Sequence, residues 1–136
     1  MNLSLVDAFA RFGAKVSNRQ RGLSALAADG ALVINCSRDY FGHPAQGVLR
    51  YEDRLSRDAS AVKETGLLGQ HLTLALDGAL PVRMVVTSVV DQKSRSRAFH
   101  IRSDLIGTVV KFDGDHFIID FTRQQNIAEV ASARRK

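Results

Sequence analysis

The feature that most constrains the fold is a pair of apolar runs in residues 106–122, IGTVVKFDGDHFIIDFT, which flank Asp113-Gly114. An Asp-Gly pair between alternating apolar runs is the strongest short-range signal for a β-hairpin. Gly114 accepts a positive φ without steric penalty, so the chain can reverse there within two residues. The sequence therefore predicts a core hairpin whose apolar residues must be covered by the rest of the chain: Val109, Phe112, Phe117 and Ile119.

The N-terminal residues predict a helix that begins at Ser4, whose hydroxyl can accept a hydrogen bond from the backbone N–H of Asp7. Its apolar stripe consists of residues spaced by four, three and four: Leu5, Phe9, Phe12 and Val16. Gly13 and Ser17-Asn18 are expected to end this helix, which should lie on a sheet.

A second Asp-Gly pair, Asp29-Gly30, predicts another hairpin within residues 23–36. A two-residue turn would pair Leu26 with Val33 and Ala27 with Leu32. Residues 37–46 break both periodicities and predict a loop, and residues 47–51 predict a short strand.

Three arginines follow at spacings of four and three: Arg50, Arg54 and Arg57. If residues 50–58 are helical, these side chains form one basic face. The favoured interpretation is a solvated turn with salt bridges, because Glu52, Asp53 and Asp58 lie between the arginines.

Residues 60–78 predict a second helix with an apolar stripe formed by Val62, Leu68, Leu72 and Leu76, ended by Gly78 and then Pro81. Residues 82–90 predict a buried strand, residues 91–97 a polar basic loop and residues 98–102 a further strand. Because hairpin connections dominate, we predict an α+β fold in which two helices pack on a curved, mainly antiparallel sheet or a partly closed β-barrel. The expected organisation is one α+β domain over residues 1–123 and a polar basic tail over residues 124–136.

The chain is basic, with a net charge of +5 and 14 arginines against 5 lysines. Because the guanidinium fork binds phosphate bidentately, this bias suits a polyanionic partner, although a mildly basic surface is a common alternative. A single cysteine, Cys36, allows no disulfide within the chain, and we expect a cytoplasmic protein with no cofactor and no membrane contact.

The predicted binding residues are arginines and aromatic residues of the loops and strand faces. Phosphates would meet the cationic side chains and bases would stack on the rings. The set is Arg38, Tyr40, Phe41, Arg50, Arg54, Lys93, Arg95, Arg97 and Arg102.

No catalytic residue or metal ligand is predicted, although three groups of residues have suitable side chains. The cluster Asp113, Asp115, His116 and Asp120 could hold a divalent cation, but turn formation accounts for its aspartates. Asp77, Asp91 and Lys93 resemble the magnesium-binding set of restriction nucleases, without its third acid. Cys36 and His43 could be a nucleophile and a base, but no third group that would orient them is evident.

Several segments resemble small uncharacterised proteins of bacterial mobile elements: GVLRYEDRLSR (47–57), PVRMVV (81–86), GTVVKFDGDHFIIDF (107–121) and the opening SLVDAFARFGAK. No known activity comes with this resemblance. Members of that group carry tryptophans in the first hairpin and after the arginine-rich turn, and this chain has none, so any binding surface made of those indoles is altered here. A mobile-element origin would imply an inhibitor of host defence, such as an anti-CRISPR or anti-restriction protein.

The first functional hypothesis is a non-enzymatic nucleic-acid-binding module. The alternatives are a small inhibitor that binds a host protein complex and, less favoured, a magnesium-dependent nuclease. A dimer formed through an edge strand is also compatible with the sequence.

Overall fold

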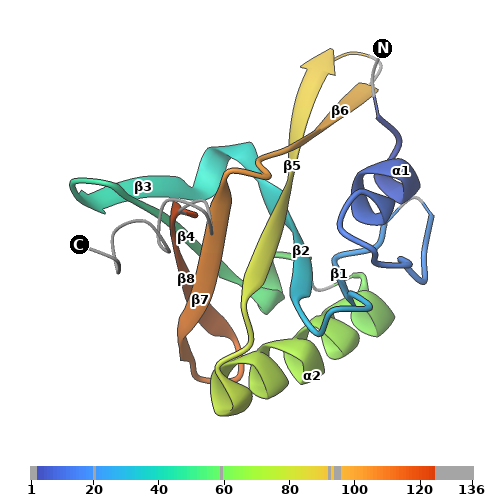
Figure 1. The fold of residues 1–136 in the computed structure, drawn as a ribbon. Helices are drawn as coiled ribbons and strands as arrows, with labels where there is room; N and C mark the ends of the chain where they lie inside the picture. The colour runs from blue at the N-terminus through green and yellow to red at the C-terminus, as the bar shows by residue number, and fades with distance from the viewer. Residues whose placement is uncertain (1–2, 20, 59, 92, 94–95, 125–136) are drawn as a thin grey trace.

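One eight-stranded sheet and two helices make up the computed structural model, which describes residues 3–19, 21–58, 60–91, 93 and 96–124 (Figure 1). The predicted α+β class and the mainly antiparallel sheet are confirmed. The sheet does not close into a barrel, because its terminal strands are not paired with each other. The predicted tail, apart from Gln124, lies outside the described residues.

The elements follow one another as helix, four strands, helix and four strands, with one short 3-10 helix before the third strand and another after the fourth. In chain order they are α1 (Leu5–Ala10), β1 (Ser24–Leu26), β2 (Leu32–Ser37), η1 (Arg38–Tyr40), β3 (Phe41–Ala45), β4 (Val48–Arg54), η2 (Leu55–Asp58), α2 (Val62–Gly78), β5 (Val82–Asp91), β6 (Ser96–Ile101), β7 (Leu105–Phe112) and β8 (His116–Arg123).

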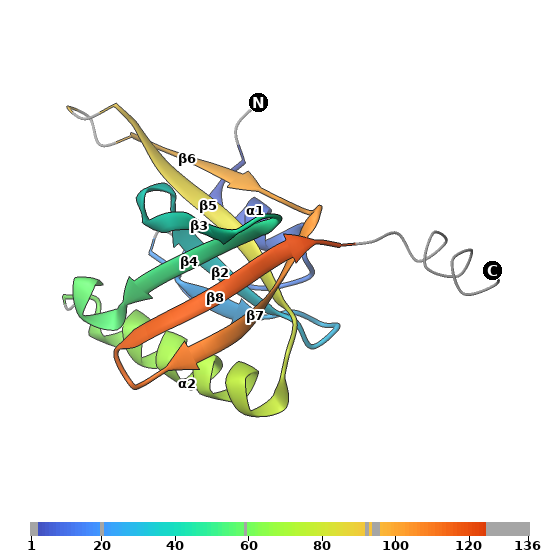
Figure 2. The ribbon, with the colours of Figure 1, turned by 90° about the vertical axis from the view of Figure 1, so that its left-hand side faces the viewer.

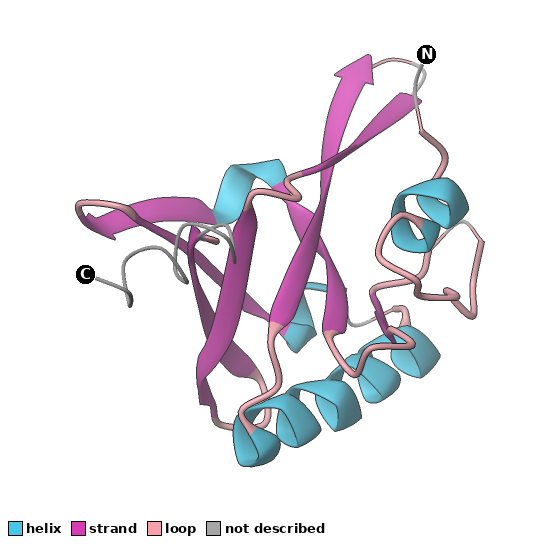
Figure 3. Cartoon of the chain, viewed as in Figure 1, coloured by secondary structure: helices cyan, strands magenta, loops and turns pink. Residues whose placement is uncertain are grey.

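The strand order is β1-β2-β5-β7-β8-β4-β3, and β6 pairs with β5 beside this path. Among the described strands only β2 and β5 pair in parallel. Figure 1 and Figure 3 show α2 lying beneath the sheet and α1 at its right-hand side, where α1 contacts β6. Beyond Thr87, β5 pairs only with β6, and the two strands project from the body as a ribbon (Figure 2).

The core has two parts, one on each side of β2. Leu32 and Ile34 face the larger part with Leu72 of α2, whereas Val33 faces the smaller part with Phe9 of α1. Burial on both faces explains why the sequence of β2 is almost continuously apolar instead of alternating.

The hairpin of residues 106–122 is confirmed as β7 and β8, and Val109, Phe117 and Ile119 are buried in it. Its connection is longer than the expected two residues, because Phe112 pairs with Phe117 and a bulge lies between Val109 and Lys111. Asp113 shapes this turn: its Oδ1 accepts from the backbone N–H groups of Asp115 (3.0 Å) and His116 (2.8 Å).

The Ser4 cap is confirmed, since its Oγ accepts from the N–H of Asp7 at 3.0 Å. The helix ends at Ala10, short of the predicted stripe, and Gly13 adopts a φ of 76°. The predicted register of the first hairpin is wrong by one residue, because Leu26 pairs with Leu32. The connection spans five residues, with Ala27 N–H donating to Ala31 O at 2.8 Å.

One prediction for the middle of the chain is wrong, and one alternative does not hold. Residues 37–46 are not a loop but contain η1 and the edge strand β3. The alternative in which residues 50–58 form one helix does not hold, because β4 continues to Arg54 and only the short 3-10 helix η2 follows it. Salt bridges within the segment join Arg57 to Asp53 and to Asp58, whereas the acid that faces Arg54, Asp115, lies in the turn before β8.

The second helix is confirmed, but its buried stripe differs from the prediction. Val62 is 74% exposed, whereas Glu64 and His71 are buried. His71 Nδ1 lies 2.8 Å from Ser24 Oγ, so β1 supplies the polar partner that allows a histidine on this face. Within the described residues no helix is long and apolar enough to cross a bilayer.

Candidate functional site

A buried carboxylate, Asp53, organises the end of β4. Its side chain points to the same side of the sheet as Tyr51, because alternate residues of a strand share a face. Tyr51 Oη donates to Asp53 Oδ2 at 2.6 Å, and the Arg57 guanidinium donates from Nε and Nη2 at 2.7 and 2.6 Å. The N–H of Arg54 adds a fourth hydrogen bond at 2.8 Å. Desolvation raises the pKa of Asp53, but these hydrogen bonds outweigh it and hold the pKa below its usual value.

The same network fixes Arg57 above an aromatic ring. Its guanidinium carbon lies 4.5 Å from the centroid of the Tyr40 ring, within the range of a cation–π contact. Hydrogen bonding to Asp53 raises the pKa of Arg57, so this side chain remains charged. Arg57 is therefore a rigid cation, and it borders two hollows on the surface.

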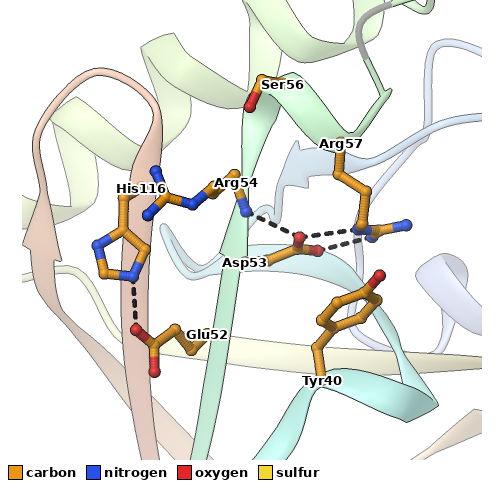
Figure 4. Close-up of a pocket in the computed structure, with 7 residues that line it drawn as sticks. All are labelled: Tyr40, Glu52, Asp53, Arg54, Ser56, Arg57 and His116. Atoms are coloured by element: carbon orange, nitrogen blue, oxygen red, sulfur yellow. Dashed lines mark hydrogen bonds and ion pairs between the residues drawn. The ribbon is translucent and has the colours of Figure 1, made fainter.

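The first hollow, which we call the His116 pocket, has a volume of about 320 Å³. Its seven lining residues come from η1, β4, η2 and β8. His116 and Glu52 stand on one side of β4, and Arg57 and Tyr40 stand on the other (Figure 4). The lining consists of Tyr40, Glu52, Asp53, Arg54, Ser56, Arg57 and His116.

Pairing between β4 and β8 brings His116 into this pocket, because Arg54 lies directly opposite it in the antiparallel register. His116 Nε2 lies 2.5 Å from Glu52 Oε2. Asp115, the preceding residue, accepts from Ser56 N (2.8 Å) and Ser56 Oγ (3.0 Å), which ties the hairpin turn to η2.

The second hollow, which we call the Arg97 groove, has a volume of about 370 Å³. Three arginines line it: Arg21, Arg57 and Arg97. Its other polar residues come from the ends of β2 and β5, from η1 and η2 and from the approach to α2, and are Asn35, Ser37, Asp39, Asp58, Ser60 and Thr87.

Arg21 is held at the groove by an Asn18 turn. The N–H of Arg21 donates to Asn18 Oδ1 at 2.9 Å, and the N–H of Gly22 donates to Asn18 O at 3.0 Å. Asn18 Nδ2 donates to Glu64 Oε1 at 3.0 Å, which joins this loop to the first turn of α2. Arg97 reaches the groove from β6, where it pairs with Val89.

Arg21 and Arg97 make no ion pair with any described residue, and neither does Arg38 on η1. Arg21 was not among the predicted binding residues. The signal for it was present, because no acidic residue occurs between Asp7 and Asp29, whereas that stretch carries Arg11, Lys15, Arg19 and Arg21.

The structure brings some of the predicted binding residues together and separates others. Tyr40 and Arg54 line the His116 pocket, and Arg97 lines the adjoining groove. Arg38 lies on η1, two residues before Tyr40, and Lys93 is exposed beyond the end of β5. Arg95 lies outside the described residues.

Three predicted residues are engaged elsewhere. Arg50 forms a bidentate pair with Asp120 at 2.8 and 2.9 Å, and Arg102 forms one with Asp104 at 3.0 and 2.9 Å. Phe41, predicted to stack on a base, has a half-buried ring that packs against Tyr51 at a centroid distance of 5.0 Å.

The three catalytic and metal constellations are not assembled as such. The acids around the hairpin turn are occupied by the turn itself, Ser56 and Arg50, and no group of three metal-ligating side chains occurs within the described part of the chain. Asp77 precedes β5 and Asp91 ends it, so a strand about 30 Å long separates them. Cys36 is buried, and desolvation raises the pKa of its thiol, whereas His43 is exposed on β3.

Comparison of the chain with protein-family models, curated proteins and solved structures found no match. The similarity to proteins of mobile elements therefore stays a prediction, and the two hollows are the features of the molecule that bear on its function.

Proposed function

We propose that this protein binds single-stranded nucleic acid, with phosphates along the Arg97 groove and one base in the His116 pocket. The observation that carries the proposal is that Arg21 and Arg97, which have no ion pair with a described residue, line one groove that adjoins a pocket of about 320 Å³ at Arg57.

A polyanion is the ligand that these cations favour. Arginine guanidinium groups bind phosphate oxygens through parallel hydrogen bonds, and the hydroxyl and amide groups of Ser37 and Asn35 offer further donors in the groove. Asp39 and Asp58 also line the groove, and Asp58 lies 3.8 Å from Arg57. The attraction therefore comes mainly from Arg21 and Arg97.

A single strand suits the shape of the site better than a duplex. Unpaired bases can be splayed out, inserted into pockets and stacked on aromatic rings or guanidinium planes, whereas duplex bases are stacked inside the helix. The pocket volume is at the small end of ligand sites, which fits one base. Tyr40, 41% exposed, supplies a ring beside that space.

The test is fluorescence anisotropy with a labelled single-stranded oligonucleotide over a series of salt concentrations. The logarithm of the binding constant should fall with the logarithm of salt, with a slope of about −0.7 for each phosphate contact. Replacing Arg21 and Arg97 together with alanine removes two contacts, so the slope should become shallower by about 1.4.

Arg123→Ala is the matched control, because Arg123 is exposed at the end of β8 remote from His116. It should leave the slope close to that of the unmodified protein. Absence of binding at low salt, or equal slopes for the double variant and the control, would refute the proposal. A protein-binding inhibitor would then be the function to test next, by recovery of a partner from nuclease-treated host lysate.

A further inference from the structure

We infer that the His116 pocket selects guanine, through the carboxylate of Glu52 and the guanidinium of Arg54. This inference rests on the proposed function and names the base that the pocket takes. Glu52 and Arg54 are two residues apart on β4, so their side chains leave the same face of the strand about 7 Å apart. One accepts hydrogen bonds only and the other donates only.

The Glu52 carboxylate is held in place and still accessible. Its Oε2 lies 2.5 Å from His116 Nε2, and its side chain is 52% exposed. Within the described residues no donor reaches Oε1. His116, whose side chain is 13% exposed, therefore acts as a positioning residue that orients an acceptor at the wall of the pocket.

Arg54 retains donors for a ligand. Its nearest acidic oxygen, Oδ2 of Asp115, is 3.6 Å from Nη1, which is longer than a hydrogen bond. The side chain is 61% exposed and extends toward His116 (Figure 4). Arg57, in contrast, uses Nε and Nη2 on Asp53 and presents its plane beside the pocket.

Guanine is the base whose edges match this pair of side chains. Its N1–H and N2 amino groups are adjacent donors for a carboxylate, and its O6 and N7 are adjacent acceptors for an arginine. Adenine and cytosine each pair a donor amino group with an acceptor ring nitrogen on the Watson–Crick edge, which a carboxylate repels. Uracil and thymine place one N–H between two acceptor oxygens. Tyr40 and Arg57 stand on the other side of β4 and stack on each other, so selection of the base falls to Glu52 and Arg54.

The first experiment uses the unmodified protein and a short labelled oligothymidylate that carries one central guanine, hypoxanthine or adenine. Hypoxanthine lacks the N2 amino group that would donate to Glu52. One good bidentate pair discriminates against a wrong base by about 5- to 150-fold. We expect guanine to bind tighter than adenine within this range, with hypoxanthine between them. Competition by guanosine monophosphate distinguishes a free nucleotide ligand from a strand, because only a strand also occupies the groove.

The second experiment uses Glu52→Gln, which offers one acceptor and one donor in place of two acceptors. The preference for guanine over adenine should fall by at least about 5-fold. Asp77→Asn makes the same chemical change at an exposed position on α2 outside the pocket and should keep the preference.

Equal affinity for the three oligonucleotides, with salt-sensitive binding intact, would overturn guanine selection while the proposed function stands. A guanine preference that survives Glu52→Gln would remove Glu52 from the inference. If no oligonucleotide binds, the proposed function and this inference fail together. The comparison of guanine with hypoxanthine needs no variant, so it decides the question even if a substitution prevents folding.

Discussion

Replacing Asp53 with alanine should destabilise the protein strongly, because Asp53 is the hub of the network that holds Arg57. The change removes four hydrogen bonds and leaves the Tyr51 hydroxyl and the Arg57 guanidinium without their partner. Removing one partner of a buried ion pair costs about 3–5 kcal/mol. The Arg57 side chain is 32% exposed and can recover part of its hydration, so we expect the free energy of unfolding to fall by about 2–3 kcal/mol.

The assay is thermal unfolding followed by circular dichroism. For a chain of this length, each kcal/mol shifts Tm by about 3 °C, which predicts a decrease of about 6–9 °C. Asp104→Ala is the matched control, since it removes a bidentate arginine partner of the same chemistry at a site where both side chains are exposed. Its Tm should change much less. Equal decreases for the two variants would refute the idea that burial makes the Asp53 network important.

Lowering the pH should remove the stabilisation that the ionised Asp53 gives to the folded protein. The pKa of Asp53 is lowered in the folded protein, so the unfolded chain takes up a proton at Asp53 more readily than the folded one. The stabilisation is therefore complete above about pH 4, the usual pKa of an aspartate, and is lost as the pH falls through the folded value. The difference in unfolding free energy between the unmodified protein and Asp53→Ala should shrink below about pH 4. A constant difference down to pH 2 would contradict this reasoning.

Three further predictions concern the body of the fold. In urea unfolding, Gly22→Ala should lower the free energy of unfolding by about 1–3 kcal/mol, because a Cβ there would lie 1.9 Å from Val16 Cγ2. Gly66→Ala should raise the free energy of unfolding by about 1 kcal/mol, because Gly66 lies on α2 with open space around it. Cys36 should react with a thiol reagent only as fast as the protein unfolds, because it is buried and burial raises its pKa; rapid native labelling would contradict its placement. Burial lowers the pKa of His71, so the unfolded chain binds a proton at His71 more readily than the folded protein does. Stability should therefore decrease as the pH falls below about 6.5. The urea midpoints measured at pH 7.5 and 5.5 should differ less for His71→Gln than for the unmodified protein.

Local signals were sufficient for much of the fold. The Asp113-Gly114 pair, the Ser4 cap and the β-branched run of β5 each depend on neighbouring residues, and all three are confirmed. β3 was missed because Gly42 and Pro44 disfavour a strand locally. Pairing with β4 on one side stabilises β3. Because β3 lies at the edge of the sheet, no described strand on its other side needs the backbone N–H that Pro44 lacks.

The candidate site was harder to predict than the fold because it is assembled by distant pairing. Glu52 and His116 are 64 residues apart and meet only through the register of β4 against β8. Tyr40 and Arg54 were identified from composition alone. The role of Asp53 could not be predicted, because a charged residue in the inward position of a strand breaks the alternating pattern that identifies a buried face.

The positions of the acidic residues explain how a protein of modest net charge can concentrate positive charge in the Arg97 groove. The acids of β4, its following turn and β8 are used within the molecule: Asp53 holds Arg57, Asp115 holds Ser56 and Asp120 holds Arg50. Two of these pairs neutralise Arg57 and Arg50, whereas Arg54 makes no hydrogen bond to an acid among the described residues. The cations left over come from the acid-free stretch between Asp7 and Asp29 and from β6, and the fold directs one from each source into a single groove. A net charge of +5 spread evenly would attract polyanions weakly, whereas two arginines that have no ion pair with a described residue, beside a fixed third, give a short anionic ligand a defined place to bind.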